Sequence, residues 1–354
     1  MTAMRLRAAL STTAALALLF CSPTARSADD ARELVATQNQ LAFYSPFWPN
    51  LHHVLYAEAW RKRGVEPERS NAGALPEPLT GDLTPEERTA WDAAVAYYDR
   101  EIADHNLLFE LGDIRRALYR GAGKLPETGL GKAHHDALAA AAPVYAKYWW
   151  PAHDRANRAW IAEAVPRVAQ LGPEVTARLT RLYGTPWFRT PARVDVVRVS
   201  MRQGNYTDGT PAPGYLTLSS SDPDNQGWAV VEVVFHESSH AVFEEALRDP
   251  IAREEREQRK RTGQLWHVAL FYIAGEVVHE ALAARKIDYN QYLYSTGLFD
   301  KAWPQFKPTI EHNMPAFVAG KTSLADAMHA LVAEAPVPAP RPPPLTAVTR
   351  RSTT

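Results

Sequence analysis

The stretch that most constrains this chain is an H-E-x-x-H motif inside a long apolar run. Residues 230–247 read VVEVVFHESSHAVFEEAL and contain His236, Glu237 and His240. On an α-helix the two histidines lie on one face about a turn apart, so both imidazoles can reach the same metal ion. Glu237 lies about 100° round the helix from His236, close enough to hold a water molecule on that metal. The motif predicts a zinc site with two histidine ligands and Glu237 as the general base.

The residues around the motif indicate a buried helix. Valine, phenylalanine and alanine occupy most positions of the run, including Val233, Val234 and Phe235. A helix that is apolar around most of its circumference is usually buried. Two histidines and a glutamate in such a helix cost free energy unless a metal or another partner satisfies them. Since a motif this short also occurs by chance, the interpretation depends on finding a third ligand.

The whole composition is that of a globular protein. The chain has 354 residues, of which 46% are hydrophobic and 22% charged, and its formal net charge is −1. This length fits one large domain or two modest ones. A near-neutral charge gives no electrostatic reason to expect a nucleic-acid partner or an anionic membrane surface. The only cysteine is Cys21, so no intramolecular disulfide can form.

The N-terminus has the pattern of a secretory signal peptide. Two arginines precede an apolar run at residues 8–20, and small residues follow. We expect cleavage after Ser27, which makes residues 1–27 the signal and places the protein in the periplasm or outside the cell. The run is shorter than the ~20 residues that span a bilayer, so we expect no stable membrane insertion. Cys21 leaves a lipid anchor open, although Phe20 is unusual just before a lipidated cysteine.

The predicted fold class is α+β, predominantly α-helical, with a small β-sheet before the motif helix. Residues 28–190 form the expected helical N-terminal region. Thr84 begins a capping signature, with Pro85 and Glu87 after it, and starts a helix that passes Tyr97. The other helices expected in this region cover residues 50–63, 132–147, 155–170 and 173–183.

The convincing β signal lies just before the motif. Residues 193–202 and 215–219 are rich in valine, leucine and threonine and have alternating patterns. They predict strands that either form a small structural sheet or offer an edge to an extended peptide beside the metal. Residues 191–334 are expected to form the metal-site region, and the order of strand, loop and H-E-x-x-H helix resembles that of zincin-type metallopeptidases. The segment 335–354 is rich in proline and predicts an extended tail.

A second long apolar helix is expected at residues 265–284 and offers the third ligand. Two histidines and one glutamate are a common catalytic zinc set, and Glu276 lies mid-helix among apolar residues. Glu280, four residues later on nearly the same face, is expected to accept a hydrogen bond from a ligating histidine. His267 lies nine residues before Glu276, about half a turn round the helix, so we expect it to be excluded from the site.

At these residues the chain resembles the gluzincin class of zinc metallopeptidases. Gluzincins have H-E-x-x-H on one helix and a glutamate ligand on a later helix, often with an acidic residue four positions beyond it. The matching residues are His236, Glu237, His240, Glu276 and Glu280. The resemblance covers residues 193–284, and its 36-residue spacing from His240 to Glu276 differs from that of the best-known members.

The resemblance implies a peptidase with one zinc ion and a peptide or protein substrate. His236, His240 and Glu276 would hold the metal, and Glu237 would activate the attacking water. Hydrolysis of a peptide bond follows from the resemblance; the residues alone would also suit another amide or an ester. Gluzincins tend to use a downstream tyrosine or histidine to stabilise the oxyanion, and the candidates by position are Tyr289, Tyr292 and Tyr294.

Two other classes of function use the same residues. Glu237-x-x-His240 and Glu276-x-x-His279 are two E-x-x-H motifs, as in ferritin-like di-iron oxidases. That interpretation also needs glutamates from two further bundle helices, and it leaves His236 unexplained. The third possibility is a non-catalytic binding protein with a structural metal site.

Overall fold

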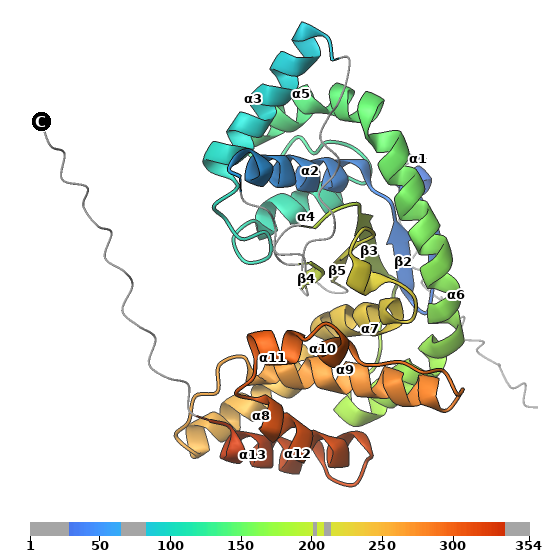
Figure 1. Cartoon of the computed structure of the whole chain (residues 1–354), viewed down its shortest axis with the longest axis vertical. Coiled ribbons are helices and arrows are strands. Elements are labelled where there is room, and N and C mark those ends of the chain that lie inside the picture. Colours follow the sequence, from blue (N-terminus) through green and yellow to red (C-terminus); the bar gives the residue numbers. More distant parts are fainter. Residues whose placement is uncertain (1–27, 65–82, 201–203, 209–213, 337–354) are drawn as a thin grey trace, which may run out of the picture.

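A computed structural model describes residues 28–64, 83–200, 204–208 and 214–336. It confirms the predicted class, a mainly helical α+β protein whose five-stranded sheet precedes the motif helix. In Figure 1 one group of helices lies above the sheet and a second group lies below it. The long helix α6 runs along the side of the molecule and connects the two groups. The predicted signal peptide and most of the predicted tail lie outside the described residues.

The chain begins with a short helix and a hairpin that the sequence analysis did not predict. Helix α1 (Ala28–Glu33) leads into β1 (Leu34–Gln38), which pairs antiparallel with β2 (Leu41–Tyr44). Asn39 and Gln40 form the turn, both with positive φ. Positive φ at both central residues suits the twist of a two-residue hairpin. The strands are too short for their periodicity to stand out.

The upper helices pack around their own apolar cluster. Tyr56, Tyr98 and Tyr145 are among its fully buried members. The capping signature at Thr84 is confirmed, because the Thr84 hydroxyl accepts from the Glu87 amide and the Glu87 carboxylate accepts from the Thr84 amide. The elements are α2 (Phe47–Lys62), α3 (Pro85–Glu101), α4 (Gly112–Arg120) and α5 (Lys132–Tyr148).

Helix α6 (Trp150–Tyr183) is one continuous element where the sequence predicts two helices. It contains Pro166 and Pro173, and a proline inside a helix costs about 3 kcal/mol or more. Apolar side chains at helical spacing lie fully buried along one face of α6. Each such side chain contributes roughly 1.5–3 kcal/mol, so the buried face outweighs the loss at the prolines. The buried residues include Ile161, Val168, Leu171, Val175 and Leu179.

The sheet has the strand order β1-β2-β3-β5-β4. β3 (Ala192–Val197) pairs parallel with β2 on one side and with β5 (Tyr215–Ser219) on the other. The first predicted strand therefore ends at Val197 and not at residue 202. β4 (Tyr206–Asp208) pairs antiparallel with β5 and forms the edge of the sheet nearest the motif helix.

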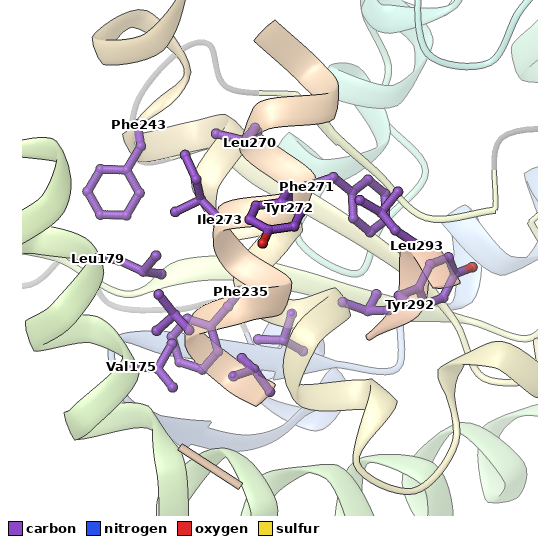
Figure 2. Packing of buried hydrophobic residues seen from close by; sticks show 14 of the residues in the cluster. Val175, Leu179, Phe235, Phe243, Leu270, Phe271, Tyr272, Ile273, Tyr292 and Leu293 are labelled. Carbon is purple, nitrogen blue, oxygen red and sulfur yellow. The ribbon is translucent and has the colours of Figure 1, made fainter. Parts of the chain in front are cut away.

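The lower half contains the motif helix and the helices that cover it. Helix α7 packs against α9, the sheet and α6, and these contacts bury its valines as predicted. Figure 2 shows Phe235 of α7 beside Val175 and Leu179 of α6. The elements are the 3₁₀ turn η1 (Pro223–Asn225), α7 (Ala229–Val242), α8 (Glu244–Glu257), α9 (Leu265–Ala283), α10 (Tyr292–Ser295), α11 (Leu298–Ala302), α12 (Lys307–Val318) and α13 (Leu324–Glu334).

None of the helices in the described ranges is long and apolar enough to cross a membrane. This holds for α7 and α9, two largely apolar helices that lie in the core of the lower half.

Candidate metal centre

Helices α7 and α9 run antiparallel, and one contact on each successive turn shows which residues face each other. The His240 ring of α7 lies 4.9 Å from the His267 ring of α9, measured between centroids. One turn earlier on α7, the His236 ring stacks on Phe271 at 3.7 Å. One turn earlier again, Glu232 faces Gly275, where an added Cβ would lie 2.6 Å from Glu232 Oε1. The facing positions thus step by four residues on both helices, as helical geometry requires.

This register assembles three histidines. His236, His240 and His267 each offer a ligand atom, and these atoms all lie within 4.8 Å of one another. In a tetrahedral zinc site with Zn–N bonds of about 2.0–2.1 Å, the nitrogens are about 3.3 Å apart. The three nitrogens would have to move closer together to hold the ion. No other such group of histidine, cysteine or carboxylate side chains occurs in the described part of the chain.

Burial favours the uncharged form of His236 and His267, which is the form that binds a cation. Burial lowers the pKa of His236 well below its usual value, and burial also lowers the pKa of His267 to about 3. Both rings are therefore neutral at physiological pH, which is the form that ligates a metal. His236 Nδ1 is buried and has no hydrogen-bond partner. A buried polar atom without a partner is costly, and the group of three histidines could hold one metal ion.

Glu244 orients one of the three histidines. Its Oε2 atom lies 2.8 Å from His240 Nδ1, and its other oxygen, Oε1, accepts from Arg248 at 2.8 Å. With the proton on Nδ1, the ring donates to Glu244 and leaves Nε2 for a metal. A carboxylate in this position sets the tautomer and raises the basicity of a ligating histidine. Glu244 was not predicted from the sequence, although its spacing of four residues from His240 on a helical pattern could have indicated it.

Glu237 is held beside the triad by the edge strand. The Thr207 hydroxyl of β4 lies 2.7 Å from Glu237 Oε2 and 2.9 Å from the Glu237 carbonyl oxygen. Burial raises the pKa of the Glu237 carboxyl, while nearby His240 and the hydrogen bond from Thr207 lower it. A carboxylate with a raised pKa is a better proton acceptor for a reaction near neutral pH. The position of Glu237 therefore suits the predicted role of general base.

Glu276 was predicted as the third ligand, but it does not belong to the group of three. His267 was predicted to be excluded, but it does belong to the group. The two residues are nine positions apart on α9, which is about 13.5 Å along the axis and half a turn round it. Only one of them can face His236 and His240, and the register selects His267. Glu276 accepts a hydrogen bond from Gln291 Nε2 and lies near Glu232, one turn before His236. The prediction had fixed the glutamate first and rejected the histidine by the same geometry.

The residues predicted around Glu276 also have other partners. Glu280 forms an ion pair with Arg178 of α6 and does not contact a histidine of the triad. His279 Nδ1 is hydrogen bonded to the Tyr289 carbonyl oxygen at 2.7 Å. The second E-x-x-H motif, Glu276 to His279, is therefore not brought to the triad. This arrangement gives no support to the di-iron interpretation.

The three candidate tyrosines have different surroundings. Tyr289 donates to Glu232 at 2.7 Å, and Tyr294 donates to Glu311 at 3.1 Å. Tyr292 stacks on Phe271, which itself stacks on His236, and it lines the same cleft as the triad. Figure 2 shows Tyr292 beside Phe271 with its hydroxyl directed away from the packed core. Only Tyr292 of the three lines the cleft.

The triad and Glu237 lie in a cleft of about 1090 Å³ between the upper and lower halves. One wall is made by α4, the segment before it and β4; the other is made by α7, α8, α9 and α11. Thr207 of the edge strand and Glu237 of the motif helix meet between these walls. The cleft is large enough for several residues of an extended chain or for a ligand of drug size.

Comparisons of the chain with protein-family models, with curated proteins and with solved structures found no match in any of the three. The functional assignment therefore rests on the site itself.

Proposed function

We propose that this protein is a zinc-dependent metallohydrolase that cleaves peptide bonds. The observation that carries the proposal is the histidine triad beside Glu237 in an open cleft. Three histidine ligands leave the fourth position of a tetrahedral metal free, which distinguishes catalytic from structural zinc sites. Compared with the sequence prediction, the proposed ligand set changes from two histidines and Glu276 to His236, His240 and His267.

The chemistry divides between the metal and the chain. A bound zinc ion would act as a Lewis acid: it would polarise the substrate carbonyl and lower the pKa of the water bound to it. Glu237 takes the proton from the attacking water and returns it to the leaving amine. Thr207 holds the Glu237 carboxylate toward the triad, and Glu244 holds the His240 ring. Tyr292 is the best placed of the three tyrosines to donate to a developing oxyanion, because it lines the cleft.

The edge strand supports a peptide as the substrate. β4 is the last strand of the sheet and pairs only with β5 among the described strands. An extended peptide can bind to such an edge through backbone hydrogen bonds. Because Thr207 on this strand contacts Glu237, a peptide bound there would pass directly beside the general base. Export to the periplasm or the exterior, proposed from residues 1–27, would expose the enzyme to peptides and proteins of that compartment.

The first test compares His267→Ala with Glu276→Ala by metal analysis of the purified chain. We expect one zinc per molecule in the wild type, loss of the zinc in His267→Ala, and full retention in Glu276→Ala. Loss of zinc from Glu276→Ala with retention in His267→Ala would restore the original ligand set. Two irons in the wild type would favour the di-iron oxidase.

The second test asks whether the site is catalytic. Glu237→Gln keeps a side chain of the same size that can still contact Thr207, so we expect normal zinc content. Hydrolysis of casein or a mixed peptide pool should fall by at least about 100-fold, since a general base contributes roughly 10²–10⁴-fold. Equal zinc and equal hydrolysis in the variant would show that Glu237 is not the base. If the zinc-loaded wild type hydrolyses no peptide, the structural metal site of a binding protein becomes the better assignment.

A further inference from the structure

Aromatic side chains form much of the lower wall of the cleft, beginning beside the histidine triad. Beside the triad, the Trp303 ring meets the His267 ring edge to face at 5.3 Å, and Phe271 lies 6.4 Å from Trp303. Tyr292 continues the wall by stacking on Phe271 at 5.5 Å. The Trp303 indole N–H already donates to Gln264 Oε1 at 2.8 Å. Its hydrogen-bonding capacity is used inside the protein, so the ring offers the cleft only apolar surface.

Apolar side chains continue this wall at the mouth of the cleft. Leu298, the first residue of α11, is half-buried and lines the cleft. Phe109 lines it from the other side, on the segment before α4, and is 80% exposed. Among the described residues, it is the large hydrophobic side chain that is exposed to solvent and not packed into the core. A single exposed phenylalanine is common on protein surfaces, but this one lines the same cleft as the triad.

The arginines that line the cleft are each paired with a carboxylate of the protein. Arg115 and Arg116 both donate to Asp208 Oδ2, at 3.1 Å and 2.7 Å. Arg116 also pairs with Asp113, and Arg248 pairs with Glu244 while its guanidinium lies over the Trp266 ring. Each of the three arginines that line the cleft is paired with a carboxylate. An acidic substrate side chain would therefore have to displace an existing ion pair, whereas an apolar one finds a preformed wall.

From these observations we propose that the cleft selects peptides with a large apolar side chain, such as leucine or phenylalanine, next to the cleaved bond. The side chain binds against Trp303, Phe271 and Leu298, while the backbone lies toward β4. This inference rests on the proposed peptidase function and adds the substrate class to it. In a hydrophobic pocket, one methylene group more or less changes kcat/KM by about 10–200-fold.

The experiment uses the zinc-loaded chain and a pool of synthetic peptides that differ at single positions. Mass spectrometry of the products identifies each cleaved bond and its rate. We expect leucine, phenylalanine, tryptophan or methionine on one side of the cleaved bond, with kcat/KM at least about tenfold above that for alanine, glycine, aspartate or lysine. Cleavage without regard to the neighbouring residue, or a preference for a charged one, would overturn the inference.

The chain offers a matched pair of variants. Leu298 and Leu324 are both half-buried leucines at the first position of a helix, but only Leu298 lines the cleft. Leu298→Ala should reduce the preference for large apolar side chains several-fold, and Leu324→Ala should leave it unchanged. Trp303→Ala should have a larger effect than Leu298→Ala, with zinc content as a check on folding. Equal selectivity in Leu298→Ala, Trp303→Ala and the wild type would contradict the assignment of this wall.

A binding measurement separates this inference from the proposed function. Hydroxamates bind active-site zinc directly, so their affinity does not depend on turnover. We compare acetohydroxamate with a hydroxamate that carries an isobutyl side chain, by calorimetry on the zinc-loaded protein. At least tenfold tighter binding of the isobutyl compound, lost in Trp303→Ala, supports the apolar subsite even if no peptide is cleaved. Equal affinity of the two compounds rejects the subsite, whatever the hydrolysis assay shows.

Discussion

At the scale of single residues, the site depends on how each polar atom in a buried region is satisfied. Glu237 contacts Thr207, and His240 contacts Glu244, so both have a protein partner. His236 Nδ1 has none. Buried ring nitrogens of His52, His53 and His134 in the upper half also lack a partner, so this feature alone does not mark the site. What marks the site is the meeting of three histidines, each of which offers a ligand atom to one metal ion.

Glu244 gives the first residue-scale prediction. Glu244→Ala removes the carboxylate that fixes the His240 tautomer, so we expect zinc affinity to fall by about 10–100-fold. Competition with a fluorescent chelator measures the Kd.

Two controls separate this effect from a general loss of charge near the cleft. Glu245→Ala removes the neighbouring exposed carboxylate, which also lines the cleft, and should leave the Kd unchanged. Arg248→Ala breaks the ion pair with Glu244 but leaves the His240 contact in place, so its effect should be small. Equal loss of affinity in Glu244→Ala and Glu245→Ala would show that only the net charge matters.

At the scale of elements, the packing of α7 against α9 decides which residues meet. Close contact at Gly275 sets how near the two helices approach, since any Cβ there would lie 2.6 Å from Glu232 Oε1. Glu232 is fully buried, and desolvation raises its pKa to about 7. Its Oε2 accepts from the Tyr289 hydroxyl and from the Tyr292 amide, so it also ties α10 to α7. Movement of Glu232 would therefore disturb both the helix pair and the cleft wall.

We predict that Gly275→Ala destabilises the protein by about 1–3 kcal/mol, because the new methyl group overpacks the contact with Glu232. Urea unfolding followed by circular dichroism measures the change. In a Glu232→Ala background the space is already open, so the same substitution should cost much less. Equal costs in the two backgrounds would mean that the contact at Gly275 does not limit the helix approach.

At the scale of the whole molecule, the triad connects two helices that are distant in sequence and lies on the lower wall of the cleft. Figure 1 shows the sheet between the two helical groups, with α7 directly below it. A metal bound by α7 and α9 would join the H-E-x-x-H helix to the helix beyond the charged α8. Zinc that binds the folded but not the unfolded chain must stabilise the fold.

We therefore predict that zinc raises the melting temperature. At a free zinc concentration about 100 times the Kd, the stabilisation is about 2.7 kcal/mol, which corresponds to several degrees. Differential scanning calorimetry with zinc and with a chelator measures the shift. His267→Ala should show almost none of it, whereas Glu276→Ala should show all of it. A full zinc-dependent shift in His267→Ala would mean that the stabilising metal binds elsewhere.

The sequence by itself determined the local features of this protein. The H-E-x-x-H spacing placed His236, Glu237 and His240 correctly on one buried helix, because three residues within five positions depend only on helical geometry. The capping box at Thr84 and the apolar helix at residues 265–284 could be predicted for the same reason. The α+β class followed from the contrast between long helical patterns and two short β patterns.

Only the tertiary structure decided the third ligand and the cleft. His267 and Glu276 lie on opposite faces of one helix, and α9 is apolar almost all round, so its pattern does not reveal which face meets α7. That choice depends on the antiparallel register, on Phe271 against His236 and on the close approach at Gly275. The partnership of Thr207 with Glu237 likewise joins residues 30 positions apart. Contacts between elements arise from packing, and a pattern within one element cannot specify them.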